Sequence, residues 1–354
     1  MIKINNSKKE IIDKKQYSCG GGWASKVGPE VLNNIVSKLP KQYDDRLVLG
    51  FENSDDCAVL ELDNDHYLIN TLDFFTPIHH NPYIFGQITA TNAVSDIFAM
   101  GGEVLNCLNI LGFPSSINES VIADILTGAI NKVNEAGGVI AGGHTISSDE
   151  IIYGLSVNGI VKKNKLKTNS NARVNQEIIL TKKLGTGVYS KEININDERE
   201  DCLEVVESMT TLNKKASEIL QNYNVSAVTD VTGFGLLGHL YEVTKASGIS
   251  AHIFMERIPL FERTREYSLK YINGGMMRNN GYFGKHVLFN DDANTEENSN
   301  ILFDPQTSGG LLIFVDSSDS KALLNELHDN GIKQASIIGK TKKAAAKFIN
   351  VFKA

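Results

Sequence analysis

Short apolar runs and segments with helical periodicity alternate along the chain. The apolar runs are strand-like and bounded by turns, and they cover residues 57–62, 67–71, 104–111, 151–161, 177–181, 225–229 and 311–315. The helical stripes cover 29–39, 86–100, 119–136, 202–223 and 232–248, and several of them end at glycine. This order recurs in both halves, so the pattern predicts two domains of α+β (mixed α/β) type.

Three segments lack such a pattern. Residues 17–28 hold four glycines and little that could form a core, which predicts a mobile loop after a flexible N-terminal tail. Residues 162–176 are polar and lysine-rich and predict a domain boundary with a solvated face. Residues 290–300 are acidic and predict an exposed loop. The predicted division is a tail and glycine-rich loop at 1–28, with domains at 29–170 and 171–354.

Composition narrows the class of protein. The chain has 354 residues, 42% of them hydrophobic, and a formal net charge of −7, which argues against a dedicated nucleic-acid surface. No apolar run approaches the length of a membrane span or a signal peptide. The four cysteines are scattered and form no disulfide framework. We therefore expect a cytoplasmic globular protein.

Aspartates recur at the ends of the predicted elements. Asp55 and Asp56 precede a strand, Asp73 and Asp230 each follow one, and Asp96 lies on the helix predicted over 86–100, one turn after Asn92. An aspartate at a strand end is often only a turn former or a helix cap. Asp96 lies among small and apolar residues and is hard to explain in that way. Carboxylates that converge on one cleft would suit Mg²⁺ bound to a polyphosphate.

Glycine-rich turns give a second signal. Residues 141–145, AGGHT, follow a strand and would present backbone N–H groups to phosphate, and 232–239, TGFGLLGH, open a helix. His144 and His239 are candidate catalytic residues or hydrogen-bonded loop anchors. The second turn also matches GxGxxG, so a dinucleotide site and simple tight packing both stay open. Lys26 ends the glycine-rich loop, where it would meet phosphates as a point charge.

Together these motifs resemble those of selenophosphate synthetase (selenide, water dikinase), in the superfamily of aminoimidazole ribonucleotide synthetase. The resemblance runs from about residue 17 nearly to the C-terminus. It rests on SDDCAV (54–59), TLDFFTP (71–77), ATNAVSDIFAMGG (90–102), ILGFP (110–114), AGGHT (141–145), LTKKLGTGV (180–188), TDVTGFGLLGHL (229–240) and DPQTSGGLL (304–312).

The resemblance implies an activity and a set of sites. Selenide, ATP and water would give selenophosphate, AMP and phosphate, and selenophosphate would serve selenocysteine and selenouridine formation. Asp56, Asp96 and Asp230 would hold Mg²⁺, with more than one ion, and Lys26 would be the essential loop lysine. The ATP contacts would come from Lys26, Asn53, Ser54, Asp55, Asp73, Asp96, Gly143, His144 and Thr145. Members of the superfamily are homodimers with two α/β domains.

One position departs from the family. Its loop usually carries Cys or selenocysteine three residues before the lysine, and here Trp23 stands there. Indole offers neither a nucleophile nor a thiolate. Three explanations compete: a UGA selenocysteine codon read as Trp, substitution by Cys19, or a paralogue without selenide chemistry. The rival functions are a kinase of the same superfamily with another acceptor, and a degenerate nucleotide-binding regulator.

Overall fold

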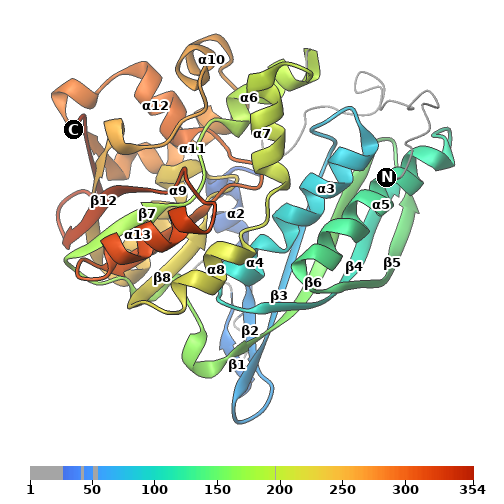
Figure 1. The fold of residues 1–354 in the computed structure, drawn as a ribbon, viewed down its shortest axis with the longest axis horizontal. Coiled ribbons are helices and arrows are strands. Elements are labelled where there is room, and N and C mark those ends of the chain that lie inside the picture. The colour runs from blue at the N-terminus through green and yellow to red at the C-terminus, as the bar shows by residue number, and fades with distance from the viewer. Residues whose placement is uncertain (1–26, 41–43, 51–54, 196) are drawn as a thin grey trace.

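The structure is a computed structural model that describes residues 27–40, 44–50, 55–195 and 197–354. Within these ranges each half of the chain forms a mixed β-sheet with helices packed against it (Figure 1). The mixed α/β fold predicted from the sequence pattern is confirmed. One cluster of buried apolar side chains runs through both halves, so the two sheets are packed together. No helix in the described part of the chain is long and apolar enough to cross a membrane.

The first sheet has six strands in the order β1-β2-β3-β6-β4-β5. All neighbours are antiparallel except β4 and β5, which the helix α5 (Glu119–Ala136) connects. A parallel pair needs such a crossover, because a tight turn reverses the chain. The strands span Leu47–Leu49 (β1), Ala58–Glu61 (β2), His66–Phe75 (β3), Glu103–Phe113 (β4), Val139–Ser147 (β5) and Ile152–Lys162 (β6).

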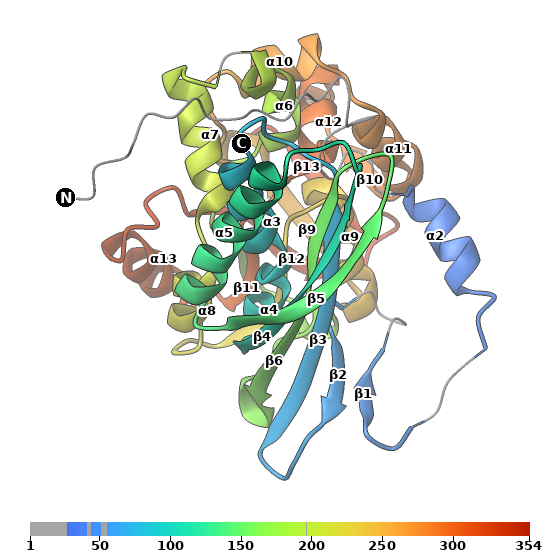
Figure 2. The ribbon, with the colours of Figure 1, turned by 90° about the vertical axis from the view of Figure 1, so that its right-hand side faces the viewer.

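Helices α3 and α5 lie side by side over one face of this sheet (Figures 1 and 2). They approach closely, because a Cβ on Gly86 would lie 1.9 Å from the Ile125 carbonyl oxygen and one on Gly128 would lie 2.0 Å from that of Tyr83. Helix α3 spans Pro82–Ala93. The other two described helices of this half are shorter and span Pro29–Val36 (α2) and Ser95–Ala99 (α4).

The helix predicted over 86–100 is in fact two helices, α3 and α4. The hydroxyls of Thr89 and Thr91 each donate to the carbonyl oxygen four residues earlier, a contact that bends helices. The prediction of one continuous helix is therefore wrong. Asn92 and Asp96 lie on different helices, yet both are close to Asp73, which accepts a hydrogen bond from Asn92 and raises the pKa of Asp96.

The other face of the first sheet is open and apolar. Leu72 and Phe74 on β3, Leu108 on β4 and Ile146 on β5 are each about half exposed, between 41% and 56%. Asn70, Asn158 and Asn106 occupy one row across three neighbouring strands of this face, and their side-chain amides form hydrogen bonds along the row. We call this row the asparagine row.

The second sheet has seven strands in the order β10-β13-β9-β12-β7-β11-β8. They span Gln176–Leu180 (β7), Val225–Asp230 (β8), Ile249–Phe254 (β9), Val287–Phe289 (β10), Leu311–Asp316 (β11), Ser336–Lys343 (β12) and Ile349–Phe352 (β13). The helices span Thr186–Ile195 (α6), Glu200–Thr210 (α7), Lys214–Leu220 (α8), Gly235–Ser247 (α9), Thr264–Lys270 (α10), Gly274–Phe283 (α11), Glu296–Phe303 (α12) and Ser320–Asp329 (α13). Helix α12 begins at Glu296, so the prediction of an exposed loop over 290–300 is wrong for its second half.

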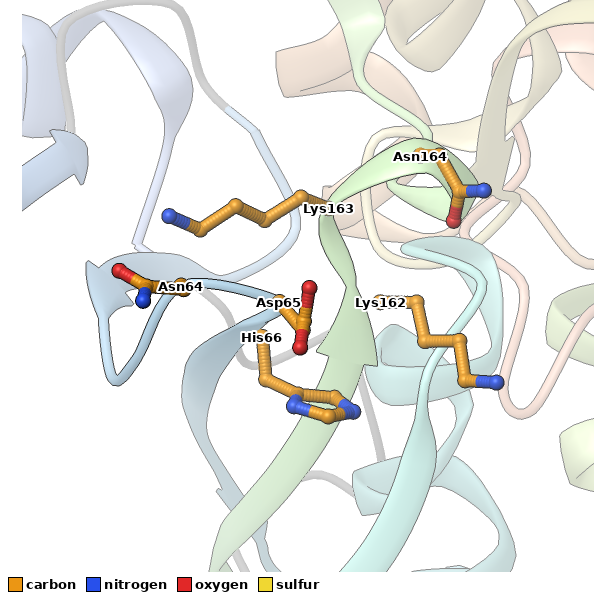
Figure 3. Close-up of a pocket in the computed structure, with 6 residues that line it drawn as sticks. All are labelled: Asn64, Asp65, His66, Lys162, Lys163 and Asn164. Carbon is orange, nitrogen blue, oxygen red and sulfur yellow. The ribbon is translucent and has the colours of Figure 1, made fainter.

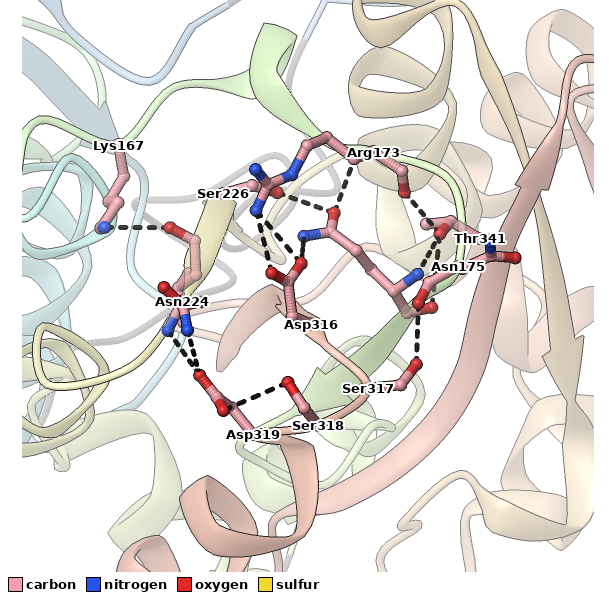
Figure 4. Close-up of polar contacts among 12 residues, drawn as sticks. Lys167, Arg173, Asn175, Asn224, Ser226, Asp316, Ser317, Ser318, Asp319 and Thr341 are labelled. Atoms are coloured by element: carbon pink, nitrogen blue, oxygen red, sulfur yellow. Dashed lines mark hydrogen bonds and ion pairs between the residues drawn. The ribbon is translucent and has the colours of Figure 1, made fainter.

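The lysine-rich segment between the sheets is tied to the second one. In Figure 4 the guanidinium of Arg173 pairs with the carboxylate of Asp316 at 3.1 Å, and Lys167 Nζ donates to the backbone oxygen of Val225 at 3.0 Å. The expectation that these lysines form only a solvated face is therefore wrong for Lys167. The domain boundary after residue 170 stays a prediction.

Candidate active site

Three aspartates from distant parts of the chain meet where the two halves touch. Asp56 lies just before β2, Asp96 lies on α4, and Asp230 is the last residue of β8. One carboxylate oxygen of each lies within 4.8 Å of the other two. The convergence that the resemblance implied is present in the geometry.

The electrostatics of this cluster call for a cation. Burial and the neighbouring Asp230 carboxylate raise the pKa of Asp56 well above its ordinary value. Burial, Asp73 and Asp230 do the same to the pKa of Asp96. Oxygen Oδ2 of Asp56 is buried and has no hydrogen-bond partner among the described residues. Carboxylate oxygens are the ligands that Mg²⁺ prefers, so this donor set fits Mg²⁺.

Hydroxyl groups hold two of these carboxylates. Thr71 Oγ1 donates to Asp96 Oδ2 at 2.5 Å, and Thr229 Oγ1 donates to Asp56 Oδ1 at 2.9 Å. Thr71 belongs to β3 and Thr229 to β8, so each half contributes one hydroxyl to the cluster. Both partners are neutral donors, which stabilise the ionised carboxylates without adding charge.

Asp73 and Asp55 border the cluster. Asp73 lies two residues before the end of β3, slightly earlier than predicted, and Asn92 Nδ2 donates to its Oδ2 at 2.8 Å. Asp55 accepts the backbone N–H of Asn169 at 2.8 Å, and burial raises the pKa of Asp55. The predicted residues Cys19, Trp23, Lys26, Asn53 and Ser54 lie outside the described residues.

The structure does not bring residues 143–145 to the aspartates. They lie inside β5, so the turn predicted at 141–145 is an edge strand. Two strands separate β5 from β3, which amounts to roughly 14 Å at the usual spacing. Glycine is required at 143 (φ 155°), where a Cβ would lie 2.3 Å from the Asn109 carbonyl oxygen. His144 is exposed on this strand.

The glycines after Asp230 serve packing. Gly235 has φ 70°, and a Cβ on Gly238 would lie 2.5 Å from Cβ of Phe234. His239 is buried, with Nε2 3.2 Å from Thr232 Oγ1 and Nδ1 3.3 Å from a Glu242 carboxylate oxygen. Tight packing and a hydrogen-bonded histidine account for this turn.

A second group of possible metal ligands, His79, His80 and Asp197, lies elsewhere. The Nδ1 atom of His79 accepts the backbone N–H of Asn81 at 3.0 Å. In the neutral ring Nε2 then carries the proton and faces Asp197 at 3.7 Å, so it has no lone pair for a metal. This group is a polar contact between the loop before α3 and the segment before α7.

A hollow of about 440 Å³ lies at the turn between β2 and β3 (Figure 3). Asp73 is seven residues further along β3 than His66, which lines this hollow, or roughly 23 Å at the rise of a strand. The hollow is therefore separate from the aspartate cluster. It is lined by Asn64, Asp65, His66, Lys162, Lys163 and Asn164.

Two family models match the chain. The AIR synthase related protein N-terminal domain matches residues 54–161, and the corresponding C-terminal domain matches 173–351. A curated relative, "Selenide, water dikinase 2" of Peptoclostridium acidaminophilum, is 43% identical over 340 residues, which make up 95% of this chain and 97% of the relative. The chain belongs to the selenide, water dikinase family. The "Selenide, water dikinase" of Clostridioides difficile (strain 630) is 42% identical over 97% of this chain and 99% of its own length.

Solved structures extend this family relationship to the fold. The structure titled "Crystal Structure of Hydrogenase Maturation Protein HypE in complex with ATP" superposes with a TM-score of 0.62 at 17% identity, over 90% of each chain. At that identity the likeness shows the fold alone. The two-domain fold of AIR synthase type that the resemblance implied is confirmed.

Several residues around the aspartates were not predicted from the sequence. They belong to motifs that carry the family resemblance, but nothing in their local pattern assigns them a role. They are Thr71, Lys182, Thr229 and Ser308. The overlooked signal is Lys182, which follows the strand-like run 177–181. It is buried, and charged side chains are rarely buried unless they are paired. Lys182 and Ser308 are treated below.

Proposed function

We propose that this protein converts selenide, ATP and water into selenophosphate, AMP and phosphate. The observation that carries the proposal is the cluster of Asp56, Asp96 and Asp230, in a chain that aligns with selenide, water dikinases over nearly its whole length. The product would serve selenocysteine and selenouridine formation. A reaction that draws on ATP also favours the cytoplasm as its location.

In this proposal Asp56, Asp96 and Asp230 hold Mg²⁺, with more than one ion. Bound Mg²⁺ would neutralise charge on the triphosphate and charge that develops during transfer. Asp55 and Asp73 contact the nucleotide beside the metal cluster. The further nucleotide contacts carried over from the family are Lys26, Asn53, Ser54 and Asp96. The family also implies Gly143, His144 and Thr145, which lie on β5 roughly 14 Å from the strand that carries Asp73, so only an extended part of the nucleotide would reach them.

The acceptor side of the reaction belongs to the glycine-rich loop. Lys26 would steady the phosphates as a point charge. A selenol or thiol at position 23 would handle selenide, and the tryptophan there lacks such a group. Selenocysteine in place of Trp23 is the explanation that we favour, with Cys19 as the alternative nucleophile.

We also propose a homodimer, formed through the open face of the first sheet. Its half-exposed Leu72, Phe74, Leu108 and Ile146 make an apolar surface of a kind that usually marks an interface. A second copy of the same face would supply matching apolar side chains, and its asparagine row would supply matching amides. Two copies related by a twofold axis would then cover both faces.

Replacing Phe74 with glutamate should break this dimer, because each copy would bury an unpaired carboxylate in the interface. The mass measured by light scattering should fall from twice 38.8 kDa to 38.8 kDa. Ile130→Glu is the matched control, since Ile130 is 42% exposed on α5, which covers the opposite face. A monomeric unsubstituted protein, or a dimeric Phe74→Glu variant, would contradict the proposed interface.

The activity itself is tested by resolving the phosphorus-containing products. The protein with cysteine or selenocysteine at position 23 is incubated with ATP, Mg²⁺ and selenide, and products are followed by ³¹P NMR. Equal amounts of selenophosphate, AMP and phosphate are expected. ADP as the sole final nucleotide product would point to a kinase with another acceptor, and ATP binding without turnover would point to a regulator.

A further inference from the structure

The loop that precedes β11 reaches across the molecule to the helix that carries Asn92. The backbone N–H of Ser308 donates to Asn92 Oδ1 at 3.0 Å, and Asn92 Nδ2 donates to Asp73 Oδ2 at 2.8 Å. A backbone N–H only donates, and an ionised carboxylate only accepts, so the two contacts fix the orientation of the Asn92 amide from both sides. A residue from the second half of the chain thereby orients a side chain beside the cluster of Asp56, Asp96 and Asp230.

Ser308 has an unusual backbone conformation. Its φ is 51°, in the left-handed region that residues with a side chain seldom adopt, and its side chain is 1% exposed. Such a conformation persists only where surrounding contacts enforce it. One of these contacts is Lys182, whose Nζ donates to the Ser308 carbonyl oxygen at 2.9 Å.

Lys182 is itself almost fully buried, at 4% exposure. Its Nζ also donates to the carbonyl oxygens of Ser208 at 3.0 Å and Thr211 at 2.7 Å. Three carbonyl oxygens need three N–H donors, which only the charged ammonium has. Burial lowers the pKa of Lys182 to about 7, and the nearby Asp230 opposes that shift. The C-terminal end of α7, where two of these carbonyls lie, also favours a cation.

Burying an ammonium group has an unfavourable desolvation free energy. An apolar side chain there would avoid burying a charge, but it would leave three carbonyl oxygens without the donor that they share. The buried ammonium thus serves to hold these three backbone oxygens in fixed positions. One of them is the carbonyl oxygen of Ser308, whose own N–H contacts Asn92, which in turn contacts Asp73.

We propose that Lys182 and Ser308 are positioning residues for ATP binding. The ammonium holds the carbonyl group of Ser308 and thereby the backbone conformation of that residue. The N–H of Ser308 orients the Asn92 amide, and the amide holds the Asp73 carboxylate in place for the nucleotide. The proposal rests on the proposed function, in which Asp73 contacts ATP. Neither Lys182 nor Ser308 touches the substrate in this arrangement.

The first test is Lys182→Met, which keeps the length of the side chain and removes its charge. Loss of a charge-assisted hydrogen bond predicts a dissociation constant for Mg²⁺-ATP roughly tenfold higher, measured by isothermal titration calorimetry. Lys183→Met is the matched control. Lys183 pairs with Glu204 at 2.6 Å on the surface, so its loss should leave the affinity unchanged.

A double-mutant cycle separates positioning from general stability. In an Asn92→Ala background, Lys182→Met should have little further effect on affinity, because the connection to Asp73 is already cut. A tenfold loss in both backgrounds would overturn the proposal, since Lys182 would then act without Asn92. Unfolding curves for all four proteins show which losses follow stability instead.

A second variant keeps the proposal testable if Lys182→Met does not fold. Asn213 Nδ2 donates to the Gly309 carbonyl oxygen at 2.9 Å and to Ser95 Oγ at 2.8 Å, so Asn213→Ala loosens the same loop from another side. A weaker affinity for Mg²⁺-ATP that disappears in the Asn92→Ala background is expected, and an unchanged affinity would contradict the proposal. If the unsubstituted protein fails to bind Mg²⁺-ATP, the proposed function is at fault. If it binds and Lys182→Met binds equally well, only the positioning role fails.

Discussion

Replacing Asp96 with asparagine is expected to lower Mg²⁺-dependent ATP turnover by at least about 100-fold, because a metal site supplies several kcal/mol of transition-state stabilisation. Asp96 shares the cluster with Asp56 and Asp230, with ligand oxygens within 4.8 Å of one another. Phosphate or AMP release at saturating Mg²⁺ measures the effect. Asp124→Asn, on the exposed side of α5, is the matched control and should keep full turnover.

Without metal, Asp96→Asn should stabilise the fold, although the same substitution lowers turnover. The pKa of Asp96 is raised in the folded protein, so its contribution to stability is present at acidic pH and is lost as pH rises through the raised value. At pH 8 the metal-free Asp96→Asn protein should therefore melt at a higher temperature than the unsubstituted protein. Mg²⁺ should raise the melting temperature of the unsubstituted protein more than that of the variant. A variant that melts lower at pH 8 without metal would contradict this description of the cluster.

The Trp23→Cys variant is expected to form selenophosphate on the order of 100-fold or more faster than the chain as written, because a thiolate replaces an unreactive indole. The affinity for Mg²⁺-ATP should change little, since the aspartates hold the metal and triphosphate. Selenophosphate formation by ³¹P NMR and ATP affinity by calorimetry are measured on the same preparations.

Two further variants separate the explanations for Trp23. Trp23→Ser places a hydroxyl at the same position and should stay near background. Cys19→Ser should have no effect on the Trp23→Cys protein if Cys19 is a spectator. Full activity of the chain as written, abolished by Cys19→Ser, would show that Cys19 is the nucleophile. A UGA codon at position 23 in the gene would support selenocysteine directly.

Elements with signals at both ends could be predicted closely from the sequence. The helix predicted over 119–136 is observed with those bounds, because the side chain of Asn118 caps its start and Gly137 ends it in a left-handed conformation. The region 202–223 was predicted as one helix and is two, with the second beginning at Lys214. Thr211 and Asn213 lie at that break, and such residues favour helix ends, but the apolar spacing on both sides of the break favoured one helix.

Contacts between distant segments account for most of what could not be predicted. Residues 141–145 have the composition of a turn, yet they continue β5 because β4 supplies hydrogen-bond partners along their whole length. The aspartates could be predicted to lie near strand ends, but their meeting depends on how the two halves pack. Lys182 and Ser308 are 126 residues apart in the sequence, so no periodic pattern could predict their contact.

The asparagine row would give the open face of the first sheet a preferred alignment against a partner in the proposed dimer. Leucine and phenylalanine side chains alone would accept many sliding positions of a partner surface. Amides from Asn70, Asn106 and Asn158 lose their solvent partners when covered, and they recover them only where other polar groups lie opposite. An apolar partner surface would leave these buried amides without hydrogen-bond partners, which would weaken its binding. In the proposed dimer the row would favour a second copy of the chain in one register over an apolar surface that lacks matching polar groups.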